Sequence, residues 1–404
     1  MNDNDDTIRR EAPTRRDYVK YGGTVVGGGL LAGCTGDGPE SDDSTSNESS
    51  SEESDAADDE RYTVDLSPVG KVEFDAPPKR VVAFDRQWIH IAYELGHGDA
   101  VVGAARPDSL WFTLHETLPG VSIDLDGIES FYGDQIDKEV LYEIDPDLIA
   151  VDPLRAPTLE GLDESDIEEL ERNVAPFFAN RYSWTEGYDG DETYTYYTLF
   201  DLYEKFGEAF EAQDRVAALR EVDEDLTETI HSDLPPEEER PTVMQVGYYD
   251  GEFYTYDIED GGIHTRHYRE VGARSAIRET YGDDVPFEFG TAVDFETLLE
   301  IDPDVLIQAS SLFYGDVEGV SHEDTVEEVS EHEVGSELTA IQNDAYYPGG
   351  TPYAGPVAYL FYSELTAKYL YPETFGEFPG LGEIPEEEQL FDRQRVADII
   401  NGDI

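Results

Sequence analysis

The residue types that could carry out catalysis or bind a metal do not form a recognisable set in this sequence of 404 residues. Eight histidines are present, and His264 and His267 lie three residues apart, but spacing fixes no Glu or Cys partner for them. A zinc or manganese site needs about three or four side-chain ligands. The sequence also lacks a Gly-x-Ser-x-Gly turn, a P-loop and a Gly-x-Gly-x-x-Gly turn after a strand. We therefore expect no enzyme, no metal site and no cofactor.

Arginines and aromatic residues gather instead in segments that follow expected strands. In α/β sheets, ligands bind beyond the carboxyl ends of the strands. Guanidinium groups pair with carboxylates or chelate oxygens, and aromatic rings stack on organic faces. The pattern predicts a cleft for a bulky ligand with anionic groups and flat organic faces. The segments concerned are 85–88, 106–111, 131–132 and Arg155 in the first half, and 248–249, 253–254, 287–289, 310–311 and 346–347 in the second.

An internal repeat indicates how these segments are positioned. Residues 139–147 read Glu-Val-Leu-Tyr-Glu-Ile-Asp-Pro-Asp, and 157 positions later residues 296–304 read Glu-Thr-Leu-Leu-Glu-Ile-Asp-Pro-Asp. Each copy predicts a short amphipathic helix, a break at Pro and a buried strand. Further apolar strands are expected at 80–84 and 242–246. The predicted fold class is therefore α/β, with two similar lobes that each contain a mainly parallel sheet covered by helices.

A single long helix is expected to join the two lobes. Apolar residues recur at helical spacing from 194 to 232, and Leu234-Pro-Pro ends the pattern. Two ordinary helices with a break near Asp214 remain the alternative. The predicted divisions are a signal at 1–33, an acidic tether at 34–61, an N-terminal lobe at 62–193, a connecting helix at 194–232 and a C-terminal lobe at 233–404.

The charge is strongly negative along the whole chain. There are 94 Asp and Glu against 26 Lys and Arg, which gives a formal net charge of −68. Nucleic-acid binding is excluded because such a surface repels phosphate. In molar salt the Debye length falls to about 3 Å, so neighbouring carboxylates no longer repel one another strongly. The composition resembles that of proteins from salt-loving archaea.

The first sixty residues resemble an export signal and a tether. Arg15 and Arg16 precede an uncharged stretch that is too short to span a bilayer, as in a twin-arginine signal. Leu-Ala-Gly-Cys34 resembles a lipobox, in which Cys34 would be acylated and become the first mature residue. Residues 35–60 contain no Lys, Arg or aromatic residue and predict a flexible spacer. We expect a lipid-anchored protein on the extracellular face of the cytoplasmic membrane.

The combination of signal, lipobox, tether, duplicated helix–Pro-Asp–strand units and connecting helix resembles the substrate-binding lipoproteins of ABC importers. Within these it is similar to the class that captures ferric siderophores, cobalamin and haem. Local support comes from Arg80-Val-Val, Tyr93-Glu-Leu-Gly, Asp99-Ala-Val-Val-Gly and Tyr268-Arg-Glu-Val-Gly, and the likeness covers about residues 75–372.

The resemblance implies a monomeric receptor that binds a small metal chelate, such as a ferric siderophore, and delivers it to an ABC permease with its ATPase. It also implies that Glu139 and Glu270, at matching positions of the two lobes, dock on the permease. The alternatives are cobalamin or haem binding by the same architecture, and a sensor or adhesive lipoprotein that presents its ligand to another protein. The ligand-binding residues that the resemblance and the cleft pattern suggest are Trp88, Arg106, Trp111, Tyr132, Tyr248, Phe287, Phe289, Tyr346 and Tyr347.

Overall fold

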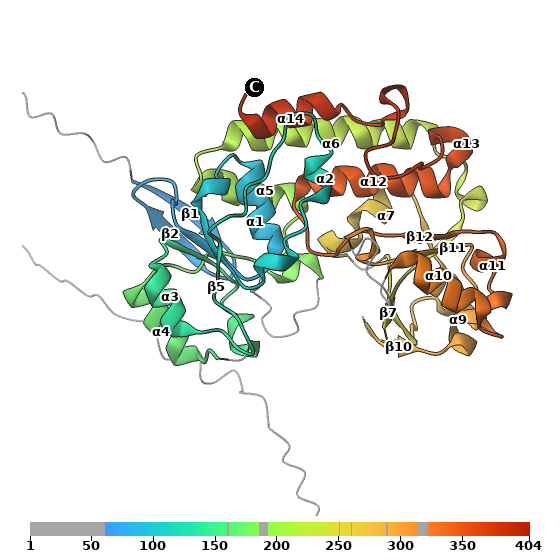
Figure 1. Cartoon of the computed structure of the whole chain (residues 1–404), viewed down its shortest axis with the longest axis horizontal. Helices are drawn as coiled ribbons and strands as arrows, with labels where there is room; N and C mark the ends of the chain where they lie inside the picture. The colour runs from blue at the N-terminus through green and yellow to red at the C-terminus, as the bar shows by residue number, and fades with distance from the viewer. Residues whose placement is uncertain are drawn as a thin grey trace, which may run out of the picture. The chain divides into compact units, whose positions relative to one another are not determined.

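The computed structural model describes residues 61–159, 161–185, 193–249, 251–259, 261–287, 290–313 and 321–404 (Figure 1). Arg15, Arg16, Cys34 and Phe289 lie outside the described residues, so their predicted roles stay predictions, as does the tether up to residue 60. No helix among the residues described is both long enough and apolar enough to cross a membrane.

The N-terminal lobe is built on a four-stranded sheet in the order β5-β4-β3-β6, in which all neighbouring strands are parallel. All residues of β3 and β6 are buried, as expected for parallel strands covered on both faces. An antiparallel hairpin of β1 and β2 precedes the sheet. The strands are β1 Tyr62–Leu66, β2 Gly70–Phe74, β3 Val81–Ala83, β4 Val101–Ala104, β5 Glu129–Ser130 and β6 Leu148–Ala150, and the helices are α1 Arg86–Glu94, α2 Thr113–Glu116, α3 Lys138–Ile144 and α4 Glu164–Asn173.

The C-terminal lobe has a separate sheet in the order β10-β8-β7-β11-β12, with β9 paired to β7. β7, β9, β11 and β12 are parallel, whereas β8 and β10 extend the sheet by antiparallel pairing. Two helix-covered, mainly parallel sheets confirm the predicted fold class. The strands are β7 Thr242–Tyr249, β8 Glu252–Tyr256, β9 Arg274–Ser275, β10 Ala292–Val293, β11 Val305–Gln308 and β12 Tyr346–Pro348, and the helices are α7 Arg266–Glu270, α8 Ala276–Tyr281, α9 Phe295–Ile301, α10 His322–Glu331 and α11 Thr339–Gln342.

The internal repeat has the same local structure in both lobes. The Asp137 and Asp294 side chains cap α3 and α9, and both helices end at an Asp in the left-handed conformation, Asp145 with φ 52° and Asp302 with φ 43°. The last Asp of each copy then accepts hydrogen bonds from the amides that start the neighbouring strand. Asp147 binds the amides of Lys79 and Arg80, each at 2.9 Å, and Asp304 binds that of Thr242 at 2.8 Å. The repeated sequence therefore fixes the helix end and the strand register together.

The predicted connecting helix at 194–232 is wrong in its extent. The chain forms α5, Leu199–Ala209, and a 21-residue helix α6, Gln213–Asp233, so the alternative with a break near Asp214 is confirmed. Glu211 adopts a positive φ of 52° at the break, and α6 folds back on α5. A Cβ on Gly207 of α5 would lie 2.5 Å from Val216 Cγ2 of α6, so the glycine permits this close crossing. At about 1.5 Å per residue, α6 alone spans roughly 30 Å.

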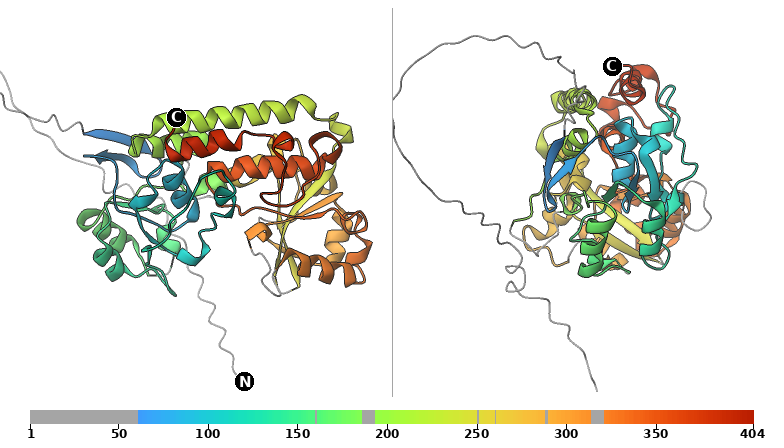
Figure 2. Two further views of the ribbon diagram at one scale, coloured as in Figure 1. Left: turned by 45° about the horizontal axis from the view of Figure 1, so that its top comes forward. Right: turned by 90° about the vertical axis from the view of Figure 1, so that its left-hand side faces the viewer.

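The end of the chain packs against both lobes. All fifteen residues of α12, Pro356–Leu370, are buried, and the helix contacts α1, α2 and α5 as well as α6 and α7. It lies side by side with α6, which α14 (Arg393–Asn401) also contacts (Figures 1 and 2). The short helix α13 is Pro372–Phe375. One hydrophobic cluster contains Trp88 and Phe206 of the first lobe, Val305 of the second, and Val357 of α12. Residues 356–401, assigned from sequence to the C-terminal lobe, therefore help to form the core of both.

Candidate ligand-binding cleft

A cavity of about 280 Å³ opens beyond the carboxyl ends of the strands of the N-terminal lobe. The loops after β3, β4, β5 and β6 supply most of its wall, and Tyr353 is contributed by the segment between β12 and α12. Such an edge is where a parallel sheet binds ligands. The residues that line the cavity are Phe84, Asp85, Arg86, Ala105, Arg106, Ser109, Leu110, Tyr132, Arg155, Leu159 and Tyr353.

Three of these residues are arginines: Arg86, Arg106 and Arg155. Arg106 is exposed, and its guanidinium carbon lies 5.5 Å from the centroid of the Tyr132 ring. Within the described part of the chain neither Arg106 nor Arg155 forms an ion pair with a carboxylate. Arg80, Arg215 and Arg240 also form no ion pair among the described residues, but each donates to a backbone carbonyl oxygen and none of them lines this cavity. Arg106 and Arg155 give the cavity a positive wall suited to an anion.

Among the described residues that line the cavity, Asp85 is the one carboxylate, and a fourth arginine neutralises it. Asp85 forms an ion pair with Arg181, whose Nε lies 3.3 Å from the Asp85 carboxylate. The Arg181 guanidinium lies 3.8 Å from the centroid of the Tyr353 ring. The loop after β6 is fixed by Asp152, which accepts hydrogen bonds from the Arg181 amide at 2.8 Å and the Tyr194 hydroxyl at 2.7 Å. The geometry of the arginine wall is therefore set by buried hydrogen bonds before any ligand arrives.

An aromatic contact joins the two lobes. The Trp111 ring, from the loop after β4, stacks on the Phe313 ring of the C-terminal lobe, with 5.4 Å between centroids and 4° between planes. The Arg86 guanidinium lies 3.7 Å from the centroid of the Trp111 ring, and Arg86 Nη1 donates to Thr351 Oγ1 at 3.3 Å. Trp111 has a positive φ of 52°, which is rare for a bulky residue and is retained only where the surroundings stabilise it.

Tyrosines cover the face of the C-terminal sheet that is not packed under α8–α10. Gly247 lies among Tyr249, Tyr254 and Tyr256, since a Cβ at this glycine would contact all three side chains within 4 Å. Burial, together with the nearby hydroxyls of Tyr249, Tyr353 and Tyr254, raises the pKa of Tyr256 to about 12. Tyr353 also lines the arginine cavity, so this tyrosine face continues from that cavity and offers rings and neutral hydroxyls.

Of the predicted ligand-binding residues, Arg106 and Tyr132 line the cavity and Trp111 lies beside it. The prediction that Trp88 contacts the ligand is corrected, because its side chain is 1% exposed and stacks on Phe206 in the core. Tyr346 is also a core residue, 5% exposed on the covered face of its sheet.

The remaining three aromatics pack against other parts of the C-terminal lobe. Tyr248 hydrogen-bonds Glu328 of α10, and burial together with this bond raises the pKa of Tyr248. Tyr347 stacks on Tyr369 at 4.4 Å, and Phe287 packs edge-on against Tyr281 at 5.6 Å. None of the three lines the arginine cavity.

Arg86, Arg155, Tyr256 and Tyr353 were not among the binding residues predicted from the sequence. The segment 85–88 and Arg155 follow expected strands, and both are part of the predicted cleft for that reason. Position after a strand could therefore have identified Arg86 and Arg155. Tyr353 follows no strand directly and Tyr256 ends one, so only the fold brings Tyr353 to the cavity and Tyr256 close to Tyr353.

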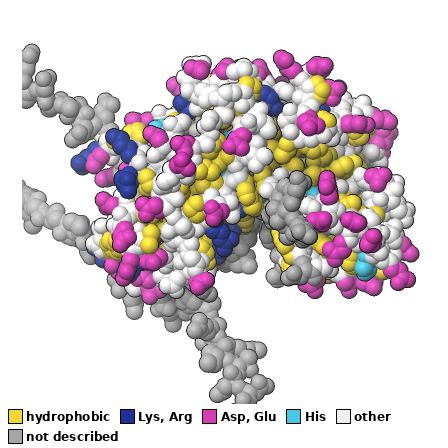
Figure 3. All heavy atoms as spheres, viewed as in Figure 1, with side chains coloured by type: hydrophobic (Ala, Val, Ile, Leu, Met, Phe, Trp, Pro, Cys, Tyr) yellow, Lys and Arg dark blue, Asp and Glu magenta, His cyan; other side chains and the backbone are white. Residues whose placement is uncertain are grey.

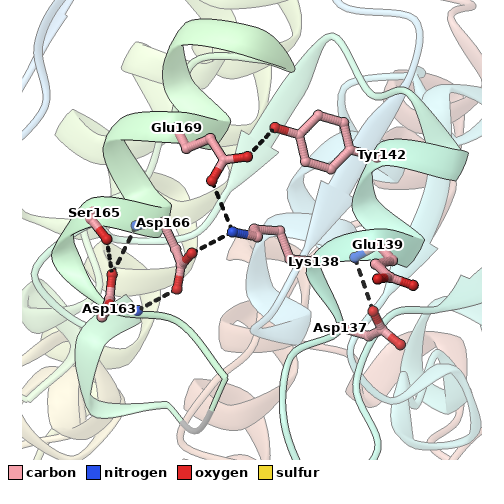
Figure 4. Close-up of polar contacts among 8 residues, drawn as sticks. All are labelled: Asp137, Lys138, Glu139, Tyr142, Asp163, Ser165, Asp166 and Glu169. Carbon is pink, nitrogen blue, oxygen red and sulfur yellow. Dashed lines mark hydrogen bonds and ion pairs between the residues drawn. The ribbon is translucent and has the colours of Figure 1, made fainter.

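The two glutamates expected to dock on the permease differ in their surroundings. Glu139 is exposed in the first turn of α3, and within the described residues its carboxylate has no partner, whereas the adjacent Lys138 bridges to Asp166 and Glu169 of α4 (Figure 4). The prediction that Glu270 docks on the permease is corrected, because this residue is largely buried. Its carboxylate is 14% exposed and pairs with Arg266 at 2.5 Å, and burial raises its pKa to about 7.

The position equivalent to Glu139 in the repeat is Glu296. It lies in the first turn of α9 and is exposed, as Glu139 is in α3. Acidic side chains are spread over both lobes on the face shown in Figure 3, so exposure alone does not single out this pair.

A larger hollow of about 590 Å³ lies along α6. It also contains arginines, but Arg220 pairs with Glu204 at 3.3 Å, and Arg266 pairs with Asp223 and Glu270. Carboxylates already neutralise these cations, so this hollow is a poorer anion receptor than the cavity beside Arg106.

The sequence profile of the family described as periplasmic binding protein matches residues 81–349. The chain belongs to this family. Proteins of the family are solute-binding proteins rather than enzymes, act on the outer side of the membrane, bind small metal chelates and work with ABC permeases. A comparison with curated proteins finds no match.

Solved structures of low sequence identity share the fold. A periplasmic binding protein from Veillonella parvula is 15% identical, with a TM-score of 0.57, and the match covers 80% of this chain and 94% of that one. The iron-uptake substrate-binding protein PiuA from Streptococcus pneumoniae is 18% identical, with a TM-score of 0.55 and coverage of 76% and 98%. The siderophore-binding protein BauB, solved with two acinetobactin molecules and ferric iron, is 16% identical, with a TM-score of 0.52 and coverage of 77% and 99%.

Proposed function

We propose that this protein is the solute-binding component of an ABC importer that captures a compact anionic iron(III) chelate, such as a ferric siderophore. The observation that carries the proposal is the cavity wall on which Arg106 and Arg155 lie without a carboxylate partner among the described residues. The anionic oxygens of a chelate would supply those partners. Proteins with the same fold include one named for iron uptake and one solved with a ferric siderophore.

The size of the cavity favours a compact chelate over cobalamin or haem. Its volume of about 280 Å³ lies just below the range of about 300–1,000 Å³ for small-molecule sites. A corrinoid or haem macrocycle would also leave most of the guanidinium groups unpaired. The Tyr249, Tyr254 and Tyr256 face would then contact the organic part of the chelate through rings and hydroxyls.

Delivery to the permease would use the exposed glutamates of the repeat. Glu139 and Glu296 lie at equivalent first-turn positions of α3 and α9, one in each lobe. A carboxylate on each lobe could pair with a cation on the permease, which would orient both lobes at once. We place the protein at the extracellular face of the cytoplasmic membrane, held there by lipid on Cys34.

The test is a binding titration in molar salt with ferric hydroxamates, ferric citrate, cobalamin and haem. Binding is detected by the change in tryptophan fluorescence. Arg106→Ala should weaken an anionic chelate by about 1.5–3 kcal/mol, roughly 10- to 150-fold, because a charge-assisted hydrogen bond is lost. The matched control is Arg172→Ala, since Arg172 lies on α4 with 68% of its side chain exposed. Equal affinity of wild type and Arg106→Ala, or tighter binding of cobalamin than of any anionic chelate, would show the proposal to be wrong.

A further inference from the structure

Three buried side chains of the N-terminal lobe carry metal-ligating atoms that the cleft does not use. His90 and Glu94 lie one turn apart on α1, and His115 lies on α2. Each is at most 1% exposed, and one ligand atom from each lies within 4.8 Å of the other two. The four-residue spacing on α1 directs its two side chains toward the same side of the helix, where α2 supplies the third.

The closest pair in this His90–Glu94–His115 cluster already has nearly the separation of two ligands on one metal. Glu94 Oε1 and His115 Nε2 are 2.9 Å apart. Nitrogen and oxygen ligands lie about 2.0–2.2 Å from zinc, so in a tetrahedral site they are roughly 3.4 Å apart. A shift of about half an ångström would therefore let a zinc ion replace the proton that these two atoms share.

His90 is held as a metal-ligating histidine is usually held. Its Nε2 donates to the carbonyl oxygen of Leu110 at 2.7 Å, and its Nδ1 accepts a hydrogen bond from the Gly355 amide at 3.2 Å. A backbone carbonyl on the second ring nitrogen is a common partner of histidine ligands, because it fixes tautomer and ring orientation. A metal ion on Nδ1 would replace the hydrogen bond from Gly355, and the His90 and His115 ring centroids are 5.1 Å apart.

Several polar atoms of the cluster have no hydrogen-bond partner among the described residues, although they are buried. These atoms are Glu94 Oε2, His115 Nδ1 and the nearby Tyr203 hydroxyl. Buried polar atoms are rarely left unpaired in native proteins, and an ion or water at the site is one explanation. A Cβ at Gly355 would lie 2.6 Å from Glu94 Oε1 and 2.7 Å from His90 Cβ, so the glycine lets the backbone approach the cluster closely.

We propose that His90, Glu94 and His115 form a buried structural site for one divalent transition-metal ion, of which zinc fits best. Two imidazole nitrogens and one carboxylate oxygen suit zinc, whereas calcium and magnesium prefer oxygen ligands throughout. Glu94 Oε1 also accepts the Val357 amide at 3.3 Å, at the start of α12. The ion would therefore hold α1, α2 and the start of α12 together, independently of the chelate carried in the cleft.

The experiment uses the full-length protein in molar potassium chloride. Bound metal is removed with a chelator, one equivalent of Zn²⁺ is added, excess is washed away, and zinc content and the thermal unfolding midpoint are measured. We expect about one zinc per chain and a midpoint raised by roughly 5 °C. Co²⁺ in place of Zn²⁺ should give a visible absorption band that is lost in Glu94→Gln. No retained zinc together with an unchanged midpoint would overturn the proposal.

Variants separate this cluster from zinc held by surface carboxylates. Glu94→Gln is nearly isosteric and resembles the protonated acid, so it should fold yet lose both the retained zinc and the rise in midpoint. His115→Ala should lose them as well. The control is His322→Ala, because His322 hydrogen-bonds Gln308 and Tyr346 away from the cluster and its loss should leave zinc binding unchanged. Zinc retained by Glu94→Gln would place the ion elsewhere and refute the site. Chelate binding in the cleft is measured separately and does not bear on this result.

Discussion

The ring of Trp111 lies parallel to that of Phe313, and this pair joins the loop after β4 to the C-terminal lobe beside the arginine cavity. Arg86 contacts Trp111 through its guanidinium and also lines the cavity. A ligand that engages Arg86 therefore acts directly on the contact between the lobes.

Phe313→Ala should lower the free energy of unfolding by about 1 kcal/mol, the usual contribution of an aromatic pair beyond its burial. It should also shift tryptophan emission to longer wavelength. Trp88 and Trp184 are at most 1% exposed, so a change of this kind reports on Trp111. Phe361→Leu, in the buried helix α12, is the comparison: it should lower stability without shifting the emission. An unshifted spectrum in Phe313→Ala would mean that the stack does not persist in solution.

His264 predicts a pH dependence of stability. Burial lowers the pKa of His264 to about 4, and its Nδ1 bonds the carbonyl oxygen of Trp184. Between pH 6.5 and 4 the unfolded chain binds a proton here and the folded chain does not, so this group's contribution to stability is lost as pH falls through that range. The loss approaches about 3 kcal/mol at the acid end.

His264→Asn keeps a donor near the position of Nδ1 and does not titrate. Protonation of the many carboxylates also changes stability, so the measured quantity is the difference between wild type and variant in denaturant unfolding at several pH values. His231→Asn, at an exposed position on α6, should follow the wild type. Parallel pH profiles for His264→Asn and wild type would contradict the assigned pKa.

The acidic surface predicts that the fold depends on salt. Lowering the ionic strength from about 1 M to 0.01 M lengthens the Debye length from about 3 Å to 30 Å, so carboxylates on both lobes repel one another. We expect dialysis to low salt to abolish the near-UV circular dichroism. Adding the salt back should restore this signal. Near-UV circular dichroism that survives low salt would count against this account of the charge.

The docking proposal predicts that Glu139→Gln and Glu296→Gln each lower chelate uptake through the cognate permease without changing chelate affinity. Because salt screens exposed pairs, the loss should reach no more than about fivefold for each. Glu143→Gln, at another exposed position of α3, is the control. Uptake unchanged in the double variant Glu139→Gln/Glu296→Gln would remove both residues from the docking surface.

The duplicated lobes could be predicted because the sequence repeats the residues that set their local structure. Asp147 and Asp304 each bind the start of a neighbouring strand, so a repeated Pro-Asp carries tertiary information. The connecting helix was predicted too long because apolar residues continue at helical spacing across the break at Glu211. The positive φ of Glu211 and the close approach of Gly207 and Val216, which show that the two helices fold back on one another, are seen only in the structure.

The aromatic side chains near the cavity were harder to predict than the arginines. Tyr248 and Tyr249 are neighbours in sequence, yet they lie on opposite faces of β7 because side chains alternate along a strand. Which face meets the ligand depends on how α8–α10 cover the sheet. The His90–Glu94–His115 cluster was missed for a related reason. The two residues on α1 have a recognisable spacing, but His115 comes from a separate helix.

The burial of α12 on every side has a consequence for how the protein is made. The core of the first lobe includes a helix that lies almost at the end of the chain. The core of that lobe cannot be completed until Pro356 and the residues after it have left the ribosome. A fragment that ends before Pro356 should therefore fail to fold into a functional lobe. Cutting the gene between its repeated units would accordingly yield two incomplete bodies, and not two independent binding modules.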